Sequence, residues 1–287
     1  MAALKEIKAR IASVRSTLKI TSAMKMVASA KLHRVQAQAQ AAAEYERGLS
    51  QIAAALTAAP DTEAASPLLL PHDKRGRAVV VAFSSDGSLC GAFNANAVKA
   101  LVQQVEQLRT EGFDRVTVIP VGEKIARAAA KAGYDTDDRF RSLVSKPACE
   151  GAAALADALM EEYAVGAADR AVLVYNHFYS MGHQAPVQEP FLPMTISAGE
   201  ESSGCVPEYI CEPGAETLLA ALLPQTLRAR LYAVLLDSAA AEQAARTVAM
   251  QTATDNAAAL LDELSLTYNK RRQQAITDEL ADITPND

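Results

Sequence analysis

The chain has 287 residues, half of them apolar, and a formal net charge of −6 at pH 7. This length allows one large domain or two ordinary ones, and the mild acidity argues against a nucleic-acid binder whose affinity comes from bulk charge. No run approaches 18 consecutive apolar residues, so we expect no transmembrane span, and the four scattered cysteines favour a reducing compartment over a disulfide framework.

The first 59 residues predict one long helix, because they contain no proline and a single glycine, Gly48. The helix would have an apolar seam on one face and basic side chains on the other, and Glu6 is the one acid in the first 34 residues. A basic amphipathic start is also typical of a targeting peptide or a membrane-surface helix, but such a segment has no need of heptad register beyond about 30 residues. The register here is unbroken, and its a and d positions are Leu4, Ile7, Ile11, Val14, Leu18, Thr21, Lys25, Ala28, Leu32 and Val35.

The middle of the chain predicts an open α/β sheet. A proline-bearing linker at 58–77 precedes apolar, β-rich runs at 78–83, 115–121 and 170–178, which we interpret as buried strands. Helical stretches separate them at about 94–109, 123–131 and 151–163, and this alternation favours a sheet with right-handed crossovers. The segments 186–196 and 206–211 alternate like strands but carry prolines, which suits the edge of a sheet.

The last third predicts a second long helix. Between Ala215 and Thr284 there is no glycine and only one proline, Pro224; Gly214 stands before the expected start and Pro285 at the stop. From Gln225 onward such a helix would be about 90 Å long. It carries an apolar seam at Met250, Ala253, Ala257, Leu260, Leu264 and Thr267, resumed at Ile276, Leu280 and Ile283.

Charge suggests that the two helices pack together. Residues 237–283 carry eight acids and four bases, whereas the first helix is basic. Acidic and basic helices gain favourable flanking pairs when they lie side by side. We therefore predict an antiparallel coiled coil of the two ends, and three parts in the chain: an N-terminal coiled-coil helix at 1–59, an α/β domain at 60–213 and a C-terminal coiled-coil helix at 214–287.

Candidate chemistry is sparse. The turn from Ser84 to Asn94 lies between a strand and a helix but matches neither phosphate-loop motif, so we interpret it as structural. The spacings of His177 with His183 and of Cys205 with Cys211 fit no common zinc site, although the two cysteines could form a redox dithiol. An enzyme that uses Asp86 and Cys90 is the remaining catalytic alternative. We expect no catalytic residues, no metal and no cofactor.

Three segments resemble the F-type ATP synthase gamma subunit. The start from Ile7 to Val14, continued by Met24-Lys25-Met26-Val27-Ala28, is similar to the beginning of that family. The end is similar too, in the run from Glu242 to Arg246 and in Ala253–Ala257, Tyr268–Lys270 and Arg272–Gln273. Between them, Ser85-Asp86 with Leu89-Cys90-Gly91 resembles the family turn S-D-x-G-L-C-G, although Gly87-Ser88 departs from it.

The resemblance implies a rotor shaft without bond chemistry of its own. Its helices would form the coiled coil inside a ring of three alpha and three beta subunits, and the α/β domain would contact the epsilon subunit and the c-ring. The chain would couple proton-driven rotation to ATP synthesis as a peripheral, non-catalytic subunit on the cytoplasmic face of a bacterial inner membrane, without inserting into the membrane or binding nucleic acid.

The resemblance also implies contact residues. Those facing the beta loops and the ring would be Met24, Lys25, Arg246, Arg272, Gln273, Thr277 and Glu279. The foot toward the c-ring and epsilon would include Tyr209 and Glu212. The chloroplast members carry a regulatory pair of cysteines roughly where Cys205 and Cys211 stand, but without their acidic segment we interpret these cysteines as structural. The alternative function is a coiled-coil adaptor whose α/β domain binds a nucleotide or another small ligand.

Overall fold

The computed structural model describes residues 2–57, 66–195, 211–212 and 214–283. Two long helices, α1 (Ala2–Thr57) and α5 (Ala215–Ile283), come first and last in the chain, and the α/β elements lie between them in sequence. The chain divides into two compact units, residues 1–30 with 246–287, and residues 31–245. Both long helices therefore contribute to both units.

The seam predicted in α1 is confirmed by burial. All ten of its a and d residues are buried or half-buried, whereas most of the residues around them are exposed. Ala28 and Leu32 are 1% and 3% exposed. A heptad repeat keeps one stripe of a helix facing its partner, and the burial pattern follows that stripe from residue 4 to residue 35.

The seam predicted in α5 is confirmed at Met250, Ala253, Ala257 and Leu264, which are buried or half-buried, and is wrong at Leu260 and Thr267. Met250 and Ala257 are buried, but Leu260 is 43% exposed, and Leu261 is half-buried instead. Tyr268 likewise takes the place predicted for Thr267, which is exposed. The buried residues keep the seven-residue repeat of Met250, Ala257 and Leu264, but the second position of each repeat is Thr254, Leu261 and Tyr268, one residue later than predicted. The resumed seam is also wrong at two described positions, because Ile276 and Leu280 are 50% and 61% exposed.

The first third of α5 is a core helix of the second unit. It begins at Ala215, directly after Gly214 as predicted, and continues through Pro224 although proline removes one backbone hydrogen bond. Four leucines, each 2% exposed or less, explain why packing outweighs that loss, because their four-residue spacing places them on one face. They are Leu219, Leu223, Leu227 and Leu231.

The sheet has five strands in the order β3-β2-β1-β4-β5. The central strand β1 (Arg77–Phe83) pairs in parallel with β2 (Arg115–Val121) and with β4 (Arg170–Ser180). A short strand, β3 (Asp135–Thr136), adds to β2 in parallel, and β5 (His183–Leu192) returns antiparallel to β4. The predicted open α/β sheet is confirmed, with its crossover helices and an antiparallel edge.

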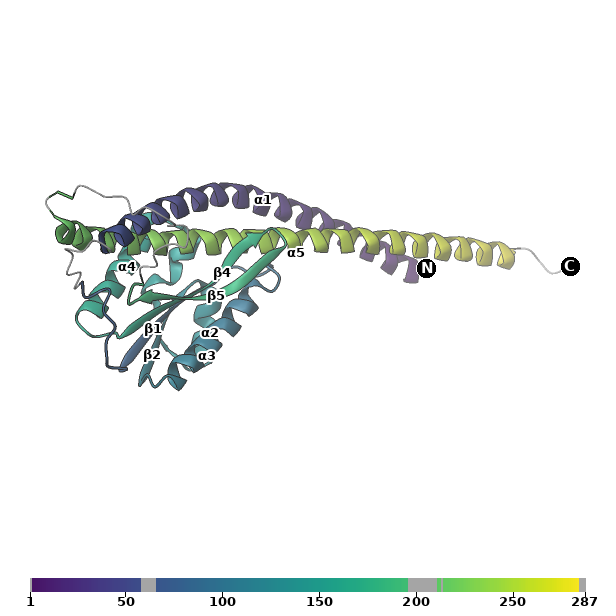
Figure 1. Ribbon diagram of the computed structural model, residues 1–287. Helices are drawn as coiled ribbons and strands as arrows, with labels where there is room; N and C mark the ends of the chain where they lie inside the picture. Colours follow the sequence, from purple (N-terminus) through teal and green to yellow (C-terminus); the bar gives the residue numbers. More distant parts are fainter. Residues whose placement is uncertain (1, 58–65, 196–210, 213, 284–287) are drawn as a thin grey trace. The chain divides into compact units, whose positions relative to one another are not determined.

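Helices cover both faces of this sheet (Figure 1). The helices α2 (Phe93–Thr110) and α3 (Glu123–Lys131) share a core with Ala78, Val80 and Ala82 of β1. The alternate residues of β1 pack with α4 (Cys149–Ala164) and with residues of α1 and α5 that belong to the same unit. Alternation along a strand sends neighbouring side chains to opposite faces, so β1 is buried on both.

Most predicted strands and helices agree with the structure to within a few residues. Two elements were not predicted: β3, and the 3₁₀ helix η1 (Asp138–Ser145). The predicted strand at 186–196 is β5, which starts earlier and ends at Leu192; Pro186 and Pro190 lie on this edge strand as expected. The strand predicted at 206–211 lies outside the described residues except for Cys211, which is in no strand.

One part of α5 is apolar enough to cross a membrane by length and composition alone. An 18-residue window within 215–278 has a mean hydropathy of 1.2, and 39% of it is buried. This is weak evidence for a span, because the core helix of a soluble protein meets the same criterion. The absence of a membrane span therefore stays a prediction.

Candidate functional site

The ends of the chain meet in a polar contact between α1 and α5. The Thr254 hydroxyl lies 2.9 Å from that of Thr21, and Lys25 Nζ donates to Gln251 Oε1 over 2.9 Å. As the residue number rises along α1, it falls along α5, so the two helices run antiparallel. Small and polar seam residues allow two helices to pair closely and fix their register. The predicted antiparallel pairing of the chain ends is thereby confirmed.

The residues predicted to contact a surrounding ring are distributed along these helices. Met24, Lys25 and Arg246 are half-buried, and Arg272, Gln273 and Thr277 are exposed on α5. The Thr277 hydroxyl donates to the Gln273 carbonyl oxygen over 3.0 Å, which is an internal helix contact. Glu279 lies within α5, but its side chain is outside the described residues.

The predicted foot is described only in part. Glu212 is exposed, whereas Tyr209 and Cys205 lie outside the described residues. The structure thus offers no test of the proposed redox pair or of a contact made by Tyr209. All of the predicted contact residues remain predictions.

The loop after β1 is a self-satisfied turn. The Ser85 backbone N–H donates to Asn94 Oδ1 over 3.1 Å, and the Ser85 hydroxyl donates to the Gly87 carbonyl over 2.6 Å. Asp86 Oδ1 accepts the backbone N–H of Glu123 over 3.0 Å, at the first residue of α3. Cys90 is buried, at 2% exposure. These contacts support the interpretation of the loop as structural, because they occupy its polar groups in positioning the two helices that follow.

Leu89 adopts the left-handed conformation in this loop, with φ of 68°. This conformation is costly for a leucine, and glycine adopts it freely. The family turn places glycine directly before the corresponding leucine, where Ser88 stands here. The departure from the family turn at Gly87-Ser88 therefore lies directly beside the strained residue, Leu89.

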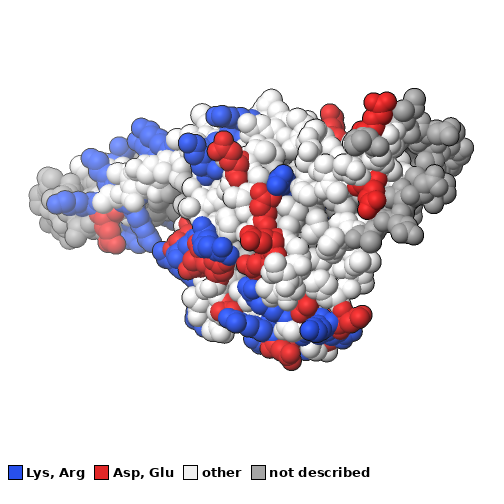
Figure 2. Space-filling view, turned by 90° about the vertical axis from the view of Figure 1, so that its left-hand side faces the viewer, with Lys and Arg blue, Asp and Glu red and all other residues white. Residues whose placement is uncertain are grey.

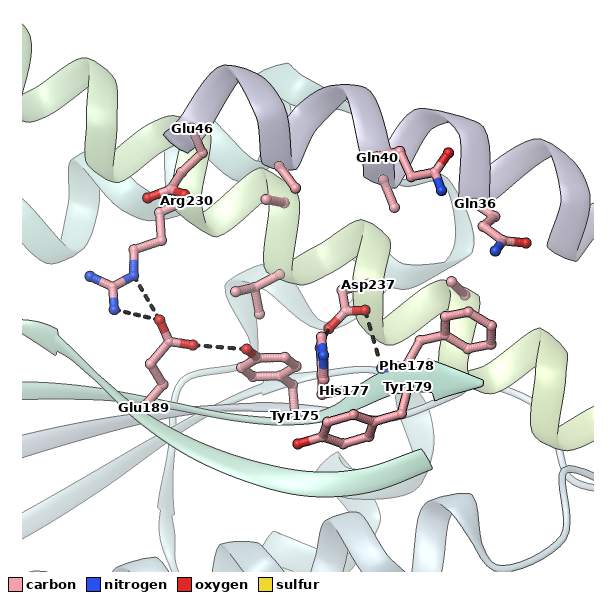
Figure 3. Close-up of a pocket in the computed structure, with 15 residues that line it drawn as sticks. Gln36, Gln40, Glu46, Tyr175, His177, Phe178, Tyr179, Glu189, Arg230 and Asp237 are labelled. Atoms are coloured by element: carbon pink, nitrogen blue, oxygen red, sulfur yellow. Dashed lines mark hydrogen bonds and ion pairs between the residues drawn. The ribbon is translucent and has the colours of Figure 1, made fainter. Parts of the chain in front are cut away.

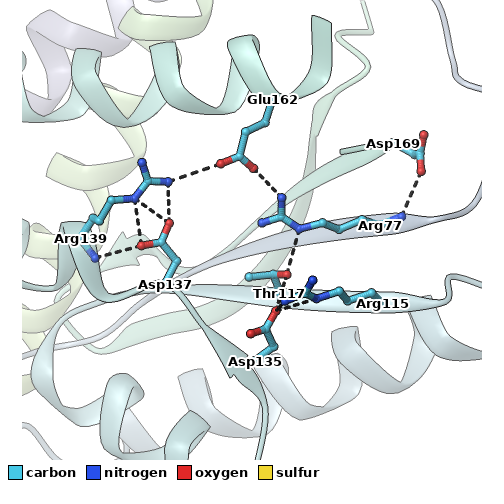
Figure 4. Close-up of polar contacts among 8 residues, drawn as sticks. All are labelled: Arg77, Arg115, Thr117, Asp135, Asp137, Arg139, Glu162 and Asp169. Atoms are coloured by element: carbon cyan, nitrogen blue, oxygen red, sulfur yellow. Dashed lines mark hydrogen bonds and ion pairs between the residues drawn. The ribbon is translucent and has the colours of Figure 1, made fainter. Parts of the chain in front are cut away.

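A charged network lies at the opposite end of the sheet, where β1 and β2 begin (Figure 4). Arg77 donates to the Thr117 hydroxyl and to Glu162, each over 3.0 Å, and so ties β1 to β2 and α4. Hydrogen bonds from the Arg139 guanidinium lower the pKa of Asp137. A hydrogen bond from the Thr117 hydroxyl is the main cause that lowers the pKa of Asp135. Because ligands of such sheets bind at the carboxyl ends of the strands, this network is structural.

Basic and acidic side chains lie interspersed on the lower part of the face seen in Figure 2. Ion pairs such as Arg77 with Glu162, and Arg139 with Asp137 at 2.6 Å, place opposite charges next to each other in the α/β part of the chain. Interspersed charges produce a weaker long-range field than a patch of one sign. This part of the surface therefore does not have the basic patch that a nucleic-acid binder would present.

A cavity of about 650 Å³ lies between α1, the β4–β5 hairpin and α5, entirely within the unit of residues 31–245. Figure 3 shows its polar side chains entering from all three elements. Its apolar lining consists of four alanines with Val234 and Phe178, and the other nine of its fifteen lining residues are polar or charged. A cavity of this size, with polar groups converging on it, has the dimensions of a small-molecule site.

Two hydrogen-bonded groups hold the cavity together. Glu189 accepts from the Tyr175 hydroxyl over 2.8 Å and from Arg230 Nε over 2.8 Å. Burial is the main cause that raises the pKa of Tyr175, and the adjacent carboxylate raises it further. These bonds join β4, β5 and α5 around one carboxylate.

The second group centres on Asp237. Its carboxylate lies 2.6 Å from His177 Nδ1 and accepts the backbone N–H of Phe178 over 3.2 Å. Burial raises the pKa of Asp237, an effect that its two donors partly oppose. Among the described residues, no group of three or more His, Cys, Asp or Glu side chains is placed to hold a metal ion.

Sequence reasoning missed this cavity, although β4 carried a signal. Tyr175, His177 and Tyr179 alternate along the strand, so they face the same side of the sheet. Polar aromatic residues at alternate positions of a largely apolar strand indicate that one side of the sheet borders a polar space. Their partners Glu189, Arg230 and Asp237 could not be assigned without the fold.

Two long helices that pair antiparallel at the ends of a chain, with a five-stranded α/β domain inserted between them in sequence, define a shaft-type subunit. Comparison with known families matches residues 3–285 to the family described as ATP synthase. The chain belongs to the family of ATP synthase gamma chains.

Its relatives support this assignment over nearly the full length. The chain is 49% identical over 286 residues to the ATP synthase gamma chain of Bacteroides fragilis strain YCH46, which covers 99% of this chain and 98% of the relative. It is 46% identical over 285 residues to that of Phocaeicola vulgatus, with the same coverage. It is 39% identical over 287 residues to that of Gluconacetobacter diazotrophicus, again covering 99% and 98%.

Solved structures show the same fold. A chain of the rotor of the Euglena gracilis mitochondrial ATP synthase matches with a TM-score of 0.61 at 18% identity, covering 96% of this chain and 99% of that chain. A chain of the central stalk and c-ring of the Tetrahymena thermophila mitochondrial ATP synthase matches with a TM-score of 0.55 at 21% identity, covering 82% and 99%.

Proposed function

We propose that this chain is the central rotor shaft of an F-type ATP synthase. It couples proton-driven rotation of a c-ring to the conformational cycling of catalytic beta subunits, and the reverse process is ATP-driven proton pumping. The single observation that supports this best is the antiparallel pairing of the two chain ends, through Thr21 with Thr254 and Lys25 with Gln251. The pairing occurs in a chain that is similar to ATP synthase gamma chains over nearly its full length. Transmission of torque requires a stiff element, and two paired helices resist bending and twisting better than one.

The proposal assigns a task to each part of the chain. The helices at 1–59 and 214–287 form the shaft, and residues 60–213 form the α/β domain between them. The partners are three alpha and three beta subunits around the shaft, with the epsilon subunit and the c-ring at the α/β domain. The subunit is peripheral on the cytoplasmic face of the inner membrane, as part of the F1 sector. It takes part in ATP synthesis without catalytic residues or a cofactor of its own.

We assign the contacts with the beta loops and the ring to seven side chains. The exposure of Arg272, Gln273 and Thr277 on α5 supports this assignment, because a contact with a surrounding ring requires an accessible side chain. The others are Met24, Lys25, Arg246 and Glu279. We assign Tyr209 and Glu212 to the foot toward the c-ring and epsilon.

A reversible lock across the seam tests the shaft directly. In a Thr21→Cys/Thr254→Cys double variant, oxidation should form a disulfide, because the replaced hydroxyl oxygens lie 2.9 Å apart. If both helices turn together as one shaft, the locked complex should keep its ATP-driven proton pumping. Loss of pumping on oxidation, with recovery on reduction, would contradict the proposal. The matched control is the Thr21→Cys single variant, which has no partner thiol across the seam.

Two further measurements separate the shaft from the adaptor alternative. A tag on this chain should co-purify six larger subunits in a three-plus-three ratio, whereas an adaptor has no reason to do so. Calorimetry with ATP, ADP and NAD on the isolated chain should show no stoichiometric binding. Tight binding of any of these nucleotides, together with failure to recover the ring, would favour the adaptor.

A further inference from the structure

The cavity between α1, the hairpin and α5 is elongated. Its lining on α1 runs from Gln36 to Glu46, and its lining on α5 runs from Arg230 to Ala240. Ten residues of helix span about 15 Å, so a ligand of this site would be long and thin. Figure 3 shows Glu46 and Arg230 at one end, Asp237 near the middle and Gln36 at the other end.

Carboxylates outnumber cations around the cavity. The lining includes three carboxylates, a single guanidinium and one histidine, and it contains no lysine; the histidine, His177, already contacts Asp237. Arg230 is already engaged by Glu189, so the guanidinium is not available to an anionic ligand. Glu46 accepts the Ser50 hydroxyl over 2.8 Å, and among the described residues no Lys or Arg forms an ion pair with it. The cavity therefore favours a cationic guest over an anionic one.

The walls indicate which cation fits. Ala39, Ala43 and Ala233 offer a smooth apolar surface, and Phe178 and Tyr179 add aromatic rings. Methylene groups gain by burial against such walls, and an ammonium group gains from nearby ring faces. A divalent metal is a poor match, because it requires several converging oxygen ligands, and the described residues contain no such group.

We infer that this cavity is a binding site for a linear alkyl diamine or a short polyamine, with one ammonium group at Glu46 and a second near Asp237. Tyr175 and Arg230 hold Glu189 at the wall of the cavity by hydrogen bonds. The site is separate from the paired seam of the chain ends, since all of its lining residues lie in the unit of 31–245. It therefore goes beyond the proposed rotor function and does not depend on it.

The test is to measure the binding of cadaverine to the full chain at low salt by isothermal titration calorimetry and by ligand-observed NMR. We expect saturable one-to-one binding with a dissociation constant below about 1 mM. Pentanediol, with the same length but no charge, and glutarate, with the opposite charge, should not bind. Pentylamine, with one ammonium group, should bind more weakly than cadaverine.

The variants give the site its specificity control. Glu46→Gln removes the carboxylate that lacks a cation partner and should weaken cadaverine binding at least about tenfold. Glu44→Gln removes the same charge two residues away on the same helix, from an exposed side chain that does not line the cavity, and should change binding less than about twofold. Asp237→Asn keeps the shape of the side chain near the middle of the cavity but removes its charge, and it should also weaken cadaverine binding.

Three outcomes would overturn the inference. The first is the absence of saturable cadaverine binding with a dissociation constant below about 1 mM. The second is an equal loss of binding in Glu46→Gln and Glu44→Gln, which would indicate general charge attraction. The third is binding of glutarate or pentanediol as tight as that of cadaverine. Circular dichroism spectra of the variants, compared with the parent chain, ensure that lost binding is not lost folding.

Discussion

Enlarging one small residue of the seam tests whether α1 and α5 are closely packed where the chain ends pair. Ala28 is 1% exposed, at a predicted a/d position of α1. Ala28→Leu adds three carbon atoms where almost no surface is open to solvent. Overpacking of this kind costs about 1–3 kcal/mol, because neighbouring side chains must leave their preferred rotamers or the helices must separate.

The matched control is Ala30→Leu. Ala30 lies two residues away on the same helix and is exposed. Alanine and leucine differ little in helix propensity, so the control isolates the packing effect and should change stability by less than about 0.5 kcal/mol. Both variants have the same composition, and they differ only in the face of α1 that carries the leucine.

Hydrogen exchange is the assay, because the effect should be local. In Ala28→Leu the amides of residues 4–30 and 246–270 should exchange about 5-fold to 150-fold faster, which corresponds to the expected cost of about 1–3 kcal/mol. Amides of β1 and β4 should keep their protection, because these strands belong to the other unit. Equal exchange in Ala28→Leu and Ala30→Leu would refute the close packing of the seam at this position.

Four other expectations follow from the same structure. Deletion of 270–287 should lower coupling or assembly of the complex without a catalytic defect in the isolated chain, and normal ATP-driven pumping without the whole C-terminal helix would contradict the rotor. Leu227→Ala should cost about 2–5 kcal/mol in urea unfolding, because Leu227 is 0% exposed in the core of the second unit, and a cost below about 1 kcal/mol would mean that the core closes around the gap. Asp237→Ala should destabilise by about 1–3 kcal/mol by leaving His177 Nδ1 and the Phe178 N–H without their acceptor, whereas Asp237→Asn should cost less; equal melting temperatures would contradict this. The pKa of Asp137 is lowered in the folded chain, so its contribution to stability is full above about pH 5 and is lost as the pH falls through the lowered pKa. Arg139→Gln should reduce the loss of stability between about pH 5 and pH 2, and an unchanged acid profile would contradict the assignment.

The charged network of Figure 4 shows how far local pattern reading could go. Two of the strands that it joins, β1 and β2, were predicted from their apolar runs, since period and composition are local properties, whereas the short strand β3 was not. Arg77 and Glu162 are 85 positions apart, however, and they meet because β1 and α4 are packed in one unit. The pairing of Arg77 with Glu162 depends on how the crossover connections run. The sequence pattern limits the possible connections but does not fix where each helix packs on the sheet.

The candidate cavity shows the same limit. The histidines of the hairpin were noticed in the sequence and considered for zinc, because the spacing of residues was the only relation available. The structure pairs His177 with Asp237, which is 60 positions away on α5. Glu189 and Arg230 carried no motif, and their meeting with Tyr175 depends on the antiparallel register of β4 and β5 and on the packing of α5.

By itself, the sequence determined the two long helices, the α/β alternation between them and the gamma-chain resemblance. Each of these depends on local features: missing prolines and glycines, a heptad repeat, apolar runs and short family segments. The tertiary structure alone decided which residue completes each heptad of the α5 seam, and it alone formed the cavity with its carboxylates. The choice of the inward residue and the contacts between distant residues depend on how elements pack, and packing is a property of the whole fold and of no single segment.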